Sequence, residues 1–341
     1  MNHGYLKEEA SFNYKLYMFI NRKEIVNKIT HFYARGEPFL FAVDFNGETG
    51  FVLSPEEAMI KGIRYEFENM KNKAAIVENL PFQFKFKPVP FKTYKKAFDK
   101  VIFHLKRGDT YLLNLTFPTA LETDLSLDAV FSLARASFKL YVPGHFAVFS
   151  PEVFVRVRGS IISSCPMKGT INARIPGAEK RLLANEKELF EHHTIVDLIR
   201  NDLSKVSTGI RVGRYRYIDR IRTNRKDLLQ MSSEICGDLP AGYEQRMGEI
   251  LFELLPAGSV TGAPKEKTVQ IIREAEICDR GFYTGIFGGF DGMSLSTAVS
   301  IRFIEETNGR LVFKSGGGIT ALSEARSEYK EMLDKVYVPV V

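Results

Sequence analysis

Apolar residues recur three and four positions apart in several segments, which is the spacing of an amphipathic helix. Residues 93–106 give the clearest example, and Gly108 directly after them is a typical helix end. Asn185 with Glu188 three residues later predicts the start of a helix that runs to about Arg200. Further helices are predicted at 24–33, at 127–136, after Pro264, over most of 223–255, and from Ser323 onward.

Other segments alternate apolar and polar residues, which predicts strands. Asn-Gly pairs at 46–47 and 308–309 predict hairpins that join 39–44 to 50–53 and 296–305 to 311–314. Residues 110–117 and most of 145–162 are also predicted to be strands. Within 296–305, Arg302 is an unusual residue, either a charge on the sheet surface or a planar fork that binds a carboxylate.

Composition fits a globular protein, because 45% of the 341 residues are hydrophobic and 26% are charged. Prolines within 85–91 predict a connector, so we expect a short N-terminal part at 1–88 that packs on a body at 89–341. No apolar run approaches the length of a membrane span, and the first residues lack the order of a secretory signal. Three cysteines without metal-ligand spacing favour a reducing cytoplasm.

The net charge of +6 is modest, and part of it lies in the arginine-rich segment 211–226. Nucleic-acid binding is one interpretation of this segment. Its alternating Val212, Tyr215 and Tyr217 favour instead a strand with a basic outer face. An anionic small substrate, steered by a positive field, explains the sign of the charge equally well. We therefore expect neither nucleic acid nor membrane as a partner.

One lysine stands in a distinctive setting. Lys168 follows the predicted strand 153–162 and lies between Pro166 and Gly169, beside the apolar Met167. Among apolar neighbours a lysine can have a lowered pKa and act as an amine nucleophile. The alternative is an exposed loop lysine, since most lysines are exposed.

Two predicted helices carry acidic stripes. Glu188 and Glu191 are three residues apart on the first, and Glu328 and Glu331 lie between Glu324 and Lys335 on the second. A solvated helix face is the usual explanation of such a stripe. The second stripe, however, follows three consecutive glycines at 316–318, whose amides could hold an anion. The adjacent histidines 192 and 193 lack a metal-binding pattern and are interpreted as structural.

Six motifs occur in one order: PMKGT, EKELFEHHTIVDLIRNDLSKV, LPAGSVTGAPKEKT, YTGIFGGF, STAVSIRF and GGGITALSEARSEYKEMLDKV. Together, over about residues 90–341, they closely resemble the chorismate-utilising enzymes, which include anthranilate, aminodeoxychorismate, isochorismate and salicylate synthases. The resemblance implies an α+β fold with a large antiparallel, sandwich-like core and surrounding helices. It also implies Mg²⁺ as the cofactor, held by two acidic helices and bound to a carboxylate of chorismate.

The resemblance assigns roles to individual residues. The implied metal ligands are Glu191 and Glu328, with Glu188 and Glu331 beside them. The implied catalytic residues are Lys168, Thr170 and Gln230. The implied substrate-binding residues are Gly169, Thr261, Tyr283, Arg302, Gly316, Gly317, Gly318 and Lys335.

Two positions separate the family's activities. Leu112 stands where isochorismate and salicylate synthases carry a base lysine, and an apolar side chain cannot activate water. Lys168 stands where anthranilate synthases lack a lysine, and with Asn114 it is typical of aminodeoxychorismate synthase component I. This implies conversion of chorismate and ammonia to 4-amino-4-deoxychorismate for p-aminobenzoate and folate, through a covalent bond to Lys168. Gln230 replaces the family's histidine and cannot transfer a proton at neutral pH.

None of the three cysteines lies in the tight glycine-flanked turn of a glutaminase nucleophile. If the nitrogen comes from glutamine, a partner glutamine amidotransferase subunit must release it. Two alternatives stay open: anthranilate synthase component I, and a non-catalytic subunit that kept the fold to bind chorismate.

Overall fold

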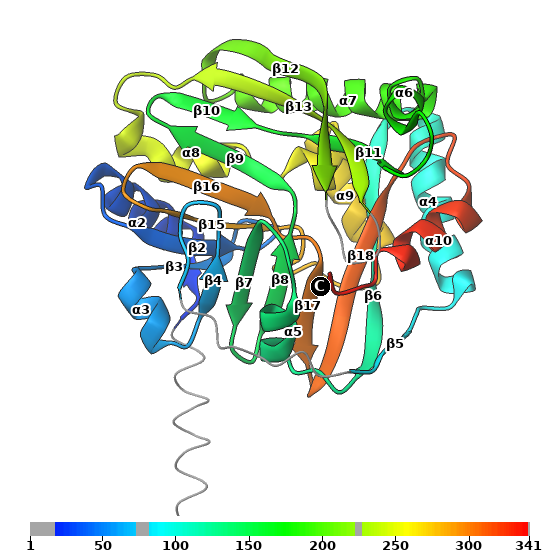
Figure 1. Ribbon diagram of the computed structural model, residues 1–341, viewed down its shortest axis with the longest axis horizontal. Coiled ribbons are helices and arrows are strands. Elements are labelled where there is room, and N and C mark those ends of the chain that lie inside the picture. The colour runs from blue at the N-terminus through cyan, green and yellow to red at the C-terminus, as the bar shows by residue number, and fades with distance from the viewer. Residues whose placement is uncertain (1–17, 73–81, 222–226, 340–341) are drawn as a thin grey trace, which may run out of the picture.

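The computed structural model describes residues 18–72, 82–221 and 227–339. Two antiparallel sheets form the centre of the molecule, and helices cover its outside (Figure 1). The predicted α+β class with a sandwich-like core is confirmed. The first sheet has ten strands, in the order β1 (Ile20–Asn21), β3 (Thr49–Leu53), β2 (Phe39–Val43), β15 (Ile286–Phe290), β16 (Ser294–Val299), β9 (Val153–Arg158), β10 (Ile161–Ser164), β13 (Leu228–Asp238) and β11 (Met167–Asn172), with β12 (Thr208–Ile221) also on β13.

The second sheet has eight strands. Their order is β14 (Gly262–Ala263), β6 (Leu112–Thr123), β18 (Arg310–Ile319), β17 (Phe303–Thr307), β8 (Phe146–Ser150), β7 (Phe138–Val142) and β4 (Arg64–Glu66), with β5 (Phe84–Lys87) also on β6. Phe287 of the first sheet and Phe138 and Phe303 of the second belong to one buried cluster, at most 1% exposed. The sheets therefore share an apolar interior.

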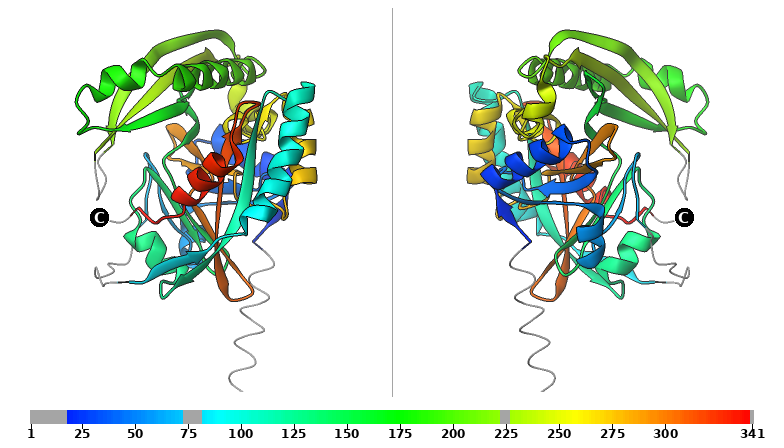
Figure 2. Two further views of the ribbon diagram at one scale, coloured as in Figure 1. Left: turned by 90° about the vertical axis from the view of Figure 1, so that its right-hand side faces the viewer. Right: turned by 90° about the vertical axis from the view of Figure 1, so that its left-hand side faces the viewer.

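The helices pack on the outer faces of the sheets. Their bounds are α2 (Arg22–Ala34), α3 (Pro55–Ile60), α4 (Phe91–Arg107), α5 (Leu127–Leu133), α6 (Ala178–Leu183), α7 (Glu186–Leu203), α8 (Met247–Glu253), α9 (Lys265–Ala275) and α10 (Ala325–Asp334), with short 3₁₀ turns η1 (Tyr243–Arg246) and η2 (Gly258–Val260). Figure 2 shows α4 and α9 side by side on one flank, where their apolar faces share a buried cluster with β6. The predicted caps are present: Asn185 accepts a hydrogen bond from the Glu188 amide at 3.1 Å, and Gly108 ends α4 at φ +79°.

The N-terminal residues contribute to both sheets. β2 pairs with β15 in the first sheet, and β4 pairs with β7 in the second. The boundary expected after residue 88 falls between β5 and α4. Strands that precede residue 88 therefore extend both sheets.

Two predicted elements are wrong. Most of 223–255 was expected to be helical, but residues 228–238 form β13, because pairing with β10, β11 and β12 outweighs local helical preference. Residues 296–305 were expected to be one strand, but the chain passes from β16 in the first sheet to β17 in the second. Arg302 lies at this crossing with φ +54°, a left-handed conformation that is strained for arginine.

Candidate active site

A cavity of about 520 Å³ is lined by residues of α7 and β11 on the side of the first sheet and by residues of β18 and α10 on the side of the second. We describe it as two walls. The helical wall consists of Glu188, Glu191, Glu328, Glu331 and Lys335; the sheet wall consists of Asn114, Glu152, Ser259, Tyr283, Arg302, Gly316 and Gly318. The structure thus brings most of the residues predicted from the sequence to one cavity.

The helical wall gathers four carboxylates from two helices. Glu328 is only 6% exposed, and its Oε1 accepts a hydrogen bond from Ser323 Oγ at 2.8 Å. Lys335 Nζ lies 2.9 Å from Glu331 Oε1 and donates to the Gly316 carbonyl at 2.9 Å. A Cβ on Gly317 would lie 3.7–3.8 Å from charged atoms of Lys335, Glu328 and Glu331. A Cβ there would make only ordinary contact with these side chains, and Gly317 does not itself line the cavity.

The carboxylates of this wall are the hard oxygen donors that Mg²⁺ prefers. Among the residues that the structure describes, no three Asp, Glu, His or Cys side chains converge closely enough to hold a metal ion. Mg²⁺ usually takes only one or two protein carboxylates and completes its shell with water and substrate oxygens. The donor set therefore fits a magnesium ion that is shared with a substrate.

The sheet wall presents backbone amides at an open strand edge. The glycines at 316–318, whose amides were expected to hold an anion, lie within β18. β17 pairs with β18 only up to Lys314, so the following residues have β6 as their partner on one side. Since antiparallel residues alternate in direction and the Gly316 carbonyl faces Lys335, the amides of Gly316 and Gly318 point away from β6 toward the cavity edge.

Tyr283 and Arg302 complete the predicted substrate side of this wall. Tyr283 is 4% exposed, and burial raises the pKa of its phenol above the usual range, so it stays a hydrogen-bond donor. The guanidinium of Arg302 lies 5.1 Å from the centre of the Tyr337 ring. The crossing between the sheets therefore places a fixed cation beside a neutral hydroxyl.

Glu152 was missed by the sequence analysis. It lies between β8 and β9, lines the sheet wall, and accepts a hydrogen bond from Ser259 Oγ. Its carboxyl belongs to the sheet wall, whereas the other four glutamates of the cavity belong to the helical wall. Nothing in its spacing marks it, since it simply precedes a strand at Ser150-Pro151-Glu152.

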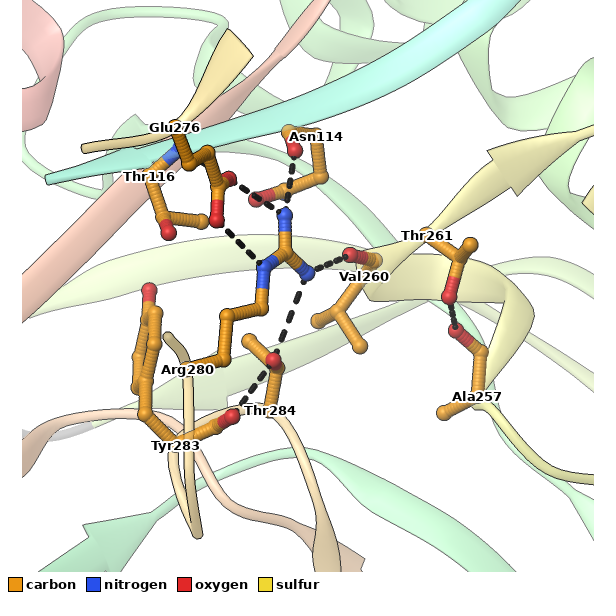
Figure 3. Close-up of polar contacts among 9 residues, drawn as sticks. All are labelled: Asn114, Thr116, Ala257, Val260, Thr261, Glu276, Arg280, Tyr283 and Thr284. Carbon is orange, nitrogen blue, oxygen red and sulfur yellow. Dashed lines mark hydrogen bonds and ion pairs between the residues drawn. The ribbon is translucent and has the colours of Figure 1, made fainter. Parts of the chain in front are cut away.

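Thr261 is not among the residues that line the cavity. It was expected to bind substrate, but its side chain is fully buried, and its hydroxyl donates to the Ala257 carbonyl at 2.7 Å (Figure 3). Its neighbours Ser259 and Val260 line the cavity in its place. The hydroxyl therefore stabilises the turn that carries them.

β11 carries two of the predicted catalytic residues, Lys168 and Thr170, and the neighbouring strand β13 carries the third, Gln230. Met167 pairs with Ser232 and Thr170 with Gln230, so β11 holds one residue more than β13 over this stretch. Gly169 has φ +80°, and a Cβ there would lie 3.0 Å from Glu188 Oε2. The extra residue is a β-bulge, a feature common beside active sites. For Lys168 and Thr170 the backbone is described, and their side chains lie outside the described part; Gln230 lines the cavity and is 8% exposed.

His192 has a polar partner inside the protein. It is fully buried on α7, with Nε2 at 2.7 Å from Ser233 Oγ of β13. This contact ties the helix that bears Glu188 and Glu191 to the first sheet. The placement agrees with the structural role predicted for this residue.

A model of the chorismate binding enzyme family matches residues 40–340. The chain belongs to this family. A PabA-like protein of Haemophilus influenzae is 46% identical, over 93% of this chain and 97% of the relative. Aminodeoxychorismate synthase component 1 of Bacillus subtilis is 30% identical, over 72% of this chain and 54% of the relative. Anthranilate synthase component 1 of Archaeoglobus fulgidus is 32% identical, over 71% and 61%. The chain thus spans little more than half of these two synthases.

Solved structures of the family share the fold. Anthranilate synthase component I of Streptococcus pneumoniae superposes with a TM-score of 0.64 at 26% identity, over 74% of this chain and 58% of that one. The menaquinone-specific isochorismate synthase MenF of Escherichia coli gives 0.69 at 16% identity, over 92% and 80%. In the part of the chain that the structure describes, no helix combines the length and apolarity needed to cross a membrane.

Proposed function

We propose that this chorismate-binding enzyme converts chorismate and ammonia to 4-amino-4-deoxychorismate and water. The β-bulge at Lys168 and Gly169 is the observation that carries the proposal. It interrupts β11 between Met167 and Thr170. Met167 and Gly169, on either side of Lys168, both line the cavity, so the lysine backbone lies at the cavity edge. A bulge of this kind re-aims a side chain relative to the regular strand.

Lys168 is the nucleophile of the proposed reaction. Its neutral amine forms a bond to ring carbon C2, the ring double bonds shift, and the C4–oxygen bond breaks. The departing oxygen leaves as water after it takes up a proton. Ammonia then forms a bond to C4, the double bonds shift back, and the lysine–C2 bond breaks and returns the amine. The proton that ammonia loses offsets the one that the leaving oxygen took.

Glu152 is the proton carrier that we assign to these steps. It lines the sheet wall, whereas the other glutamates of the cavity lie on the helical wall. A positioned acid of this kind contributes roughly 10²–10⁴-fold to a rate. Gln230, which stands in the place of the family's histidine, can only orient the substrate by hydrogen bonding. In this assignment the Glu152 carboxyl transfers protons, and the four carboxylates of the helical wall bind a cation.

The remaining wall residues bind the two carboxylates of chorismate. Glu191 and Glu328, with Glu188 and Glu331 beside them, would hold Mg²⁺, which when bound offsets the charge of one substrate carboxylate. Arg302, Tyr283 and the amides at Gly316 and Gly318 supply donors for the other. Lys335 carries a further positive charge at the edge of the helical wall.

A partner glutaminase subunit is the proposed source of ammonia. Desolvation raises the pKa of the thiols of the buried Cys165 and the half-buried Cys236, and also that of Cys278, although the Cys278 residue is exposed. A glutaminase nucleophile needs the opposite shift, because the thiolate is the reactive form. The isolated chain should therefore use ammonium and not glutamine, and a separate glutaminase should confer glutamine use. Hydrolysis of glutamine by the purified chain alone would contradict this part of the proposal.

Product identification tests the activity. The purified chain is incubated with chorismate, ammonium and Mg²⁺, and the product is identified by mass and ultraviolet spectrum. We expect 4-amino-4-deoxychorismate with no release of pyruvate. Anthranilate with pyruvate would instead make the chain an anthranilate synthase component, and unconsumed chorismate would make it a binding subunit.

A further inference from the structure

A buried ion pair lies directly behind the sheet wall (Figure 3). The side chains of Arg280 and Glu276 are only 2% and 4% exposed. Arg280 Nη2 lies 2.7 Å from Glu276 Oε1, and Arg280 Nε lies 3.0 Å from Oε2. Glu276 Oε1 also accepts from the Thr116 amide of β6 at 2.8 Å. The carboxylate thus fixes both the plane of the guanidinium and its place against β6.

The rest of the guanidinium holds backbone that forms the cavity. Its Nη2 donates to the Asn114 carbonyl at 2.6 Å, and its Nη1 donates to the Val260 carbonyl at 2.8 Å. Nη1 also lies 3.3 Å from Thr284 Oγ1. Asn114 and Val260 line the cavity, as does Tyr283, the neighbour of Thr284. One planar group therefore joins three separate segments of the site, while Arg280 itself does not line the cavity.

The same network reaches the crossing that carries Arg302. Thr284 adopts φ +61°, which is strained for a β-branched residue, and its amide donates to the Ser300 carbonyl at 2.7 Å. Ser300 in turn donates to the Gly285 carbonyl at 2.8 Å. Such strain persists where surrounding contacts over-determine the backbone, as they do here.

We propose that Arg280, clamped by Glu276, is a positioning residue that sets the sheet wall for substrate. It acts through Asn114, Tyr283 and Arg302 and does not touch the substrate. Pairing between β6 and β18 already stabilises the fold of this region. The ion pair of Arg280 and Glu276 therefore serves to position the residues of the site precisely. A displacement of catalytic groups by about 1 Å can cost about 100-fold in rate. The inference rests on chorismate binding in this cavity, as the proposed function does, but not on which product forms.

Arg280→Lys is the principal test, because lysine keeps the charge and loses the planar fork. We expect chorismate to bind at least about tenfold more weakly, and its maximal consumption rate to fall at least about tenfold, since several wall groups shift together. Binding is measured by calorimetry, and turnover by loss of chorismate absorbance, both well below the melting temperature. Unchanged affinity and unchanged turnover would overturn the proposal.

Lys139→Met is the matched control. Lys139 is a buried cation of the second sheet that pairs with Glu66 and donates to the Ala134 carbonyl at 3.1 Å, away from the cavity. This variant should lower the melting temperature and leave chorismate affinity and turnover unchanged. If it weakens chorismate binding as much as Arg280→Lys does, the effect reports general destabilisation and the proposal fails.

Glu276→Gln keeps the inference testable if Arg280→Lys fails to fold. Glutamine retains one acceptor oxygen for Thr116 and Arg280 and loses the second. We expect a smaller loss of affinity, about two- to fivefold, and a double variant no weaker than Arg280→Lys alone, because the two residues act as one unit. A change in melting temperature without any change in affinity would contradict the assignment. Since affinity is measured whatever product forms, a wrong activity and a wrong role for Arg280 give different results.

Discussion

The helical wall and the sheet wall face the same cavity, but they hold their charges differently. At the sheet wall, two buried cations already have internal partners: Arg280, behind the wall, has Glu276, and Lys314, which lines the cavity, lies 2.9 Å from Glu305. Lys314 also donates to the Arg280 carbonyl at 3.0 Å, which joins the two pairs. The helical wall instead brings four carboxylates and one lysine together, and the Glu331 side chain is 50% exposed.

This difference indicates that the two walls have different roles in binding. The geometry of the sheet wall is set by hydrogen bonds within the protein, so it is ready before substrate arrives. The helical wall has more negative than positive side chains, so a bound cation would offset part of its charge. That cation would in turn bind a carboxylate of the substrate. We infer that a bound cation completes the helical wall. The preformed sheet wall then selects the substrate that fits it.

The largest expected effect is at the helical wall. Glu328→Gln removes a negative oxygen from a hard-cation site, so kcat/KM for chorismate should fall at least about 100-fold. The protein should remain folded by circular dichroism. Glu324→Gln is the matched control, since it makes the same change on an exposed residue at the start of the same helix and should have no effect. Undiminished turnover of Glu328→Gln at limiting Mg²⁺ would remove the metal assignment.

The next effect is at the sheet wall. Glu152→Gln keeps the shape of the side chain and removes its proton, so kcat should fall about 100-fold with little change in KM. Ser259→Ala removes only the hydrogen bond to Glu152 and should cost a few-fold at most. Steady-state kinetics over a range of pH measures both variants. If kcat survives in Glu152→Gln, the proton comes from another group or from water.

A smaller effect is expected at Gln230, which also lines the cavity. Gln230 lies in β13 opposite Thr170 of β11, and Gln230→His restores a protonatable group there. The rate should stay within about threefold of the parent or rise, and a pH dependence near 6.5 should appear, where histidine titrates. A pH–rate profile identical to that of the parent would mean that this position takes no part in proton transfer.

No catalytic effect is expected behind the sheet wall at Thr261. Thr261→Val keeps the volume and removes the hydrogen bond to Ala257, at a cost of about 1–2 kcal/mol in the free energy of unfolding. Denaturant unfolding measures the loss, and kcat/KM for chorismate should not change. If Thr261→Val loses more activity than its loss of stability explains, Thr261 would again be assigned to substrate binding.

The helical wall could be predicted from sequence more fully than the sheet wall. Helical spacing alone places Glu188 with Glu191, and Glu328 with Glu331, on single faces, and the caps locate the helices. The sheet wall depends on long-range pairing, which leaves no local pattern. The alternation of 296–305 continues through a change of sheet at Arg302, so the strand looked unbroken. Glu152 and Arg280 gain their surroundings only through residues distant in the chain.

The most direct test of the account is a search for a covalent adduct on Lys168. The protein is quenched during turnover of chorismate, digested, and analysed by mass spectrometry. We predict that the peptide containing Lys168 carries the substrate ring, and that Lys168→Ala shows neither the adduct nor the parent rate. Lys168→Arg should fare no better, because its guanidinium stays protonated. Formation of 4-amino-4-deoxychorismate by Lys168→Ala at the parent rate, with no adduct on the parent protein, would contradict the central claim.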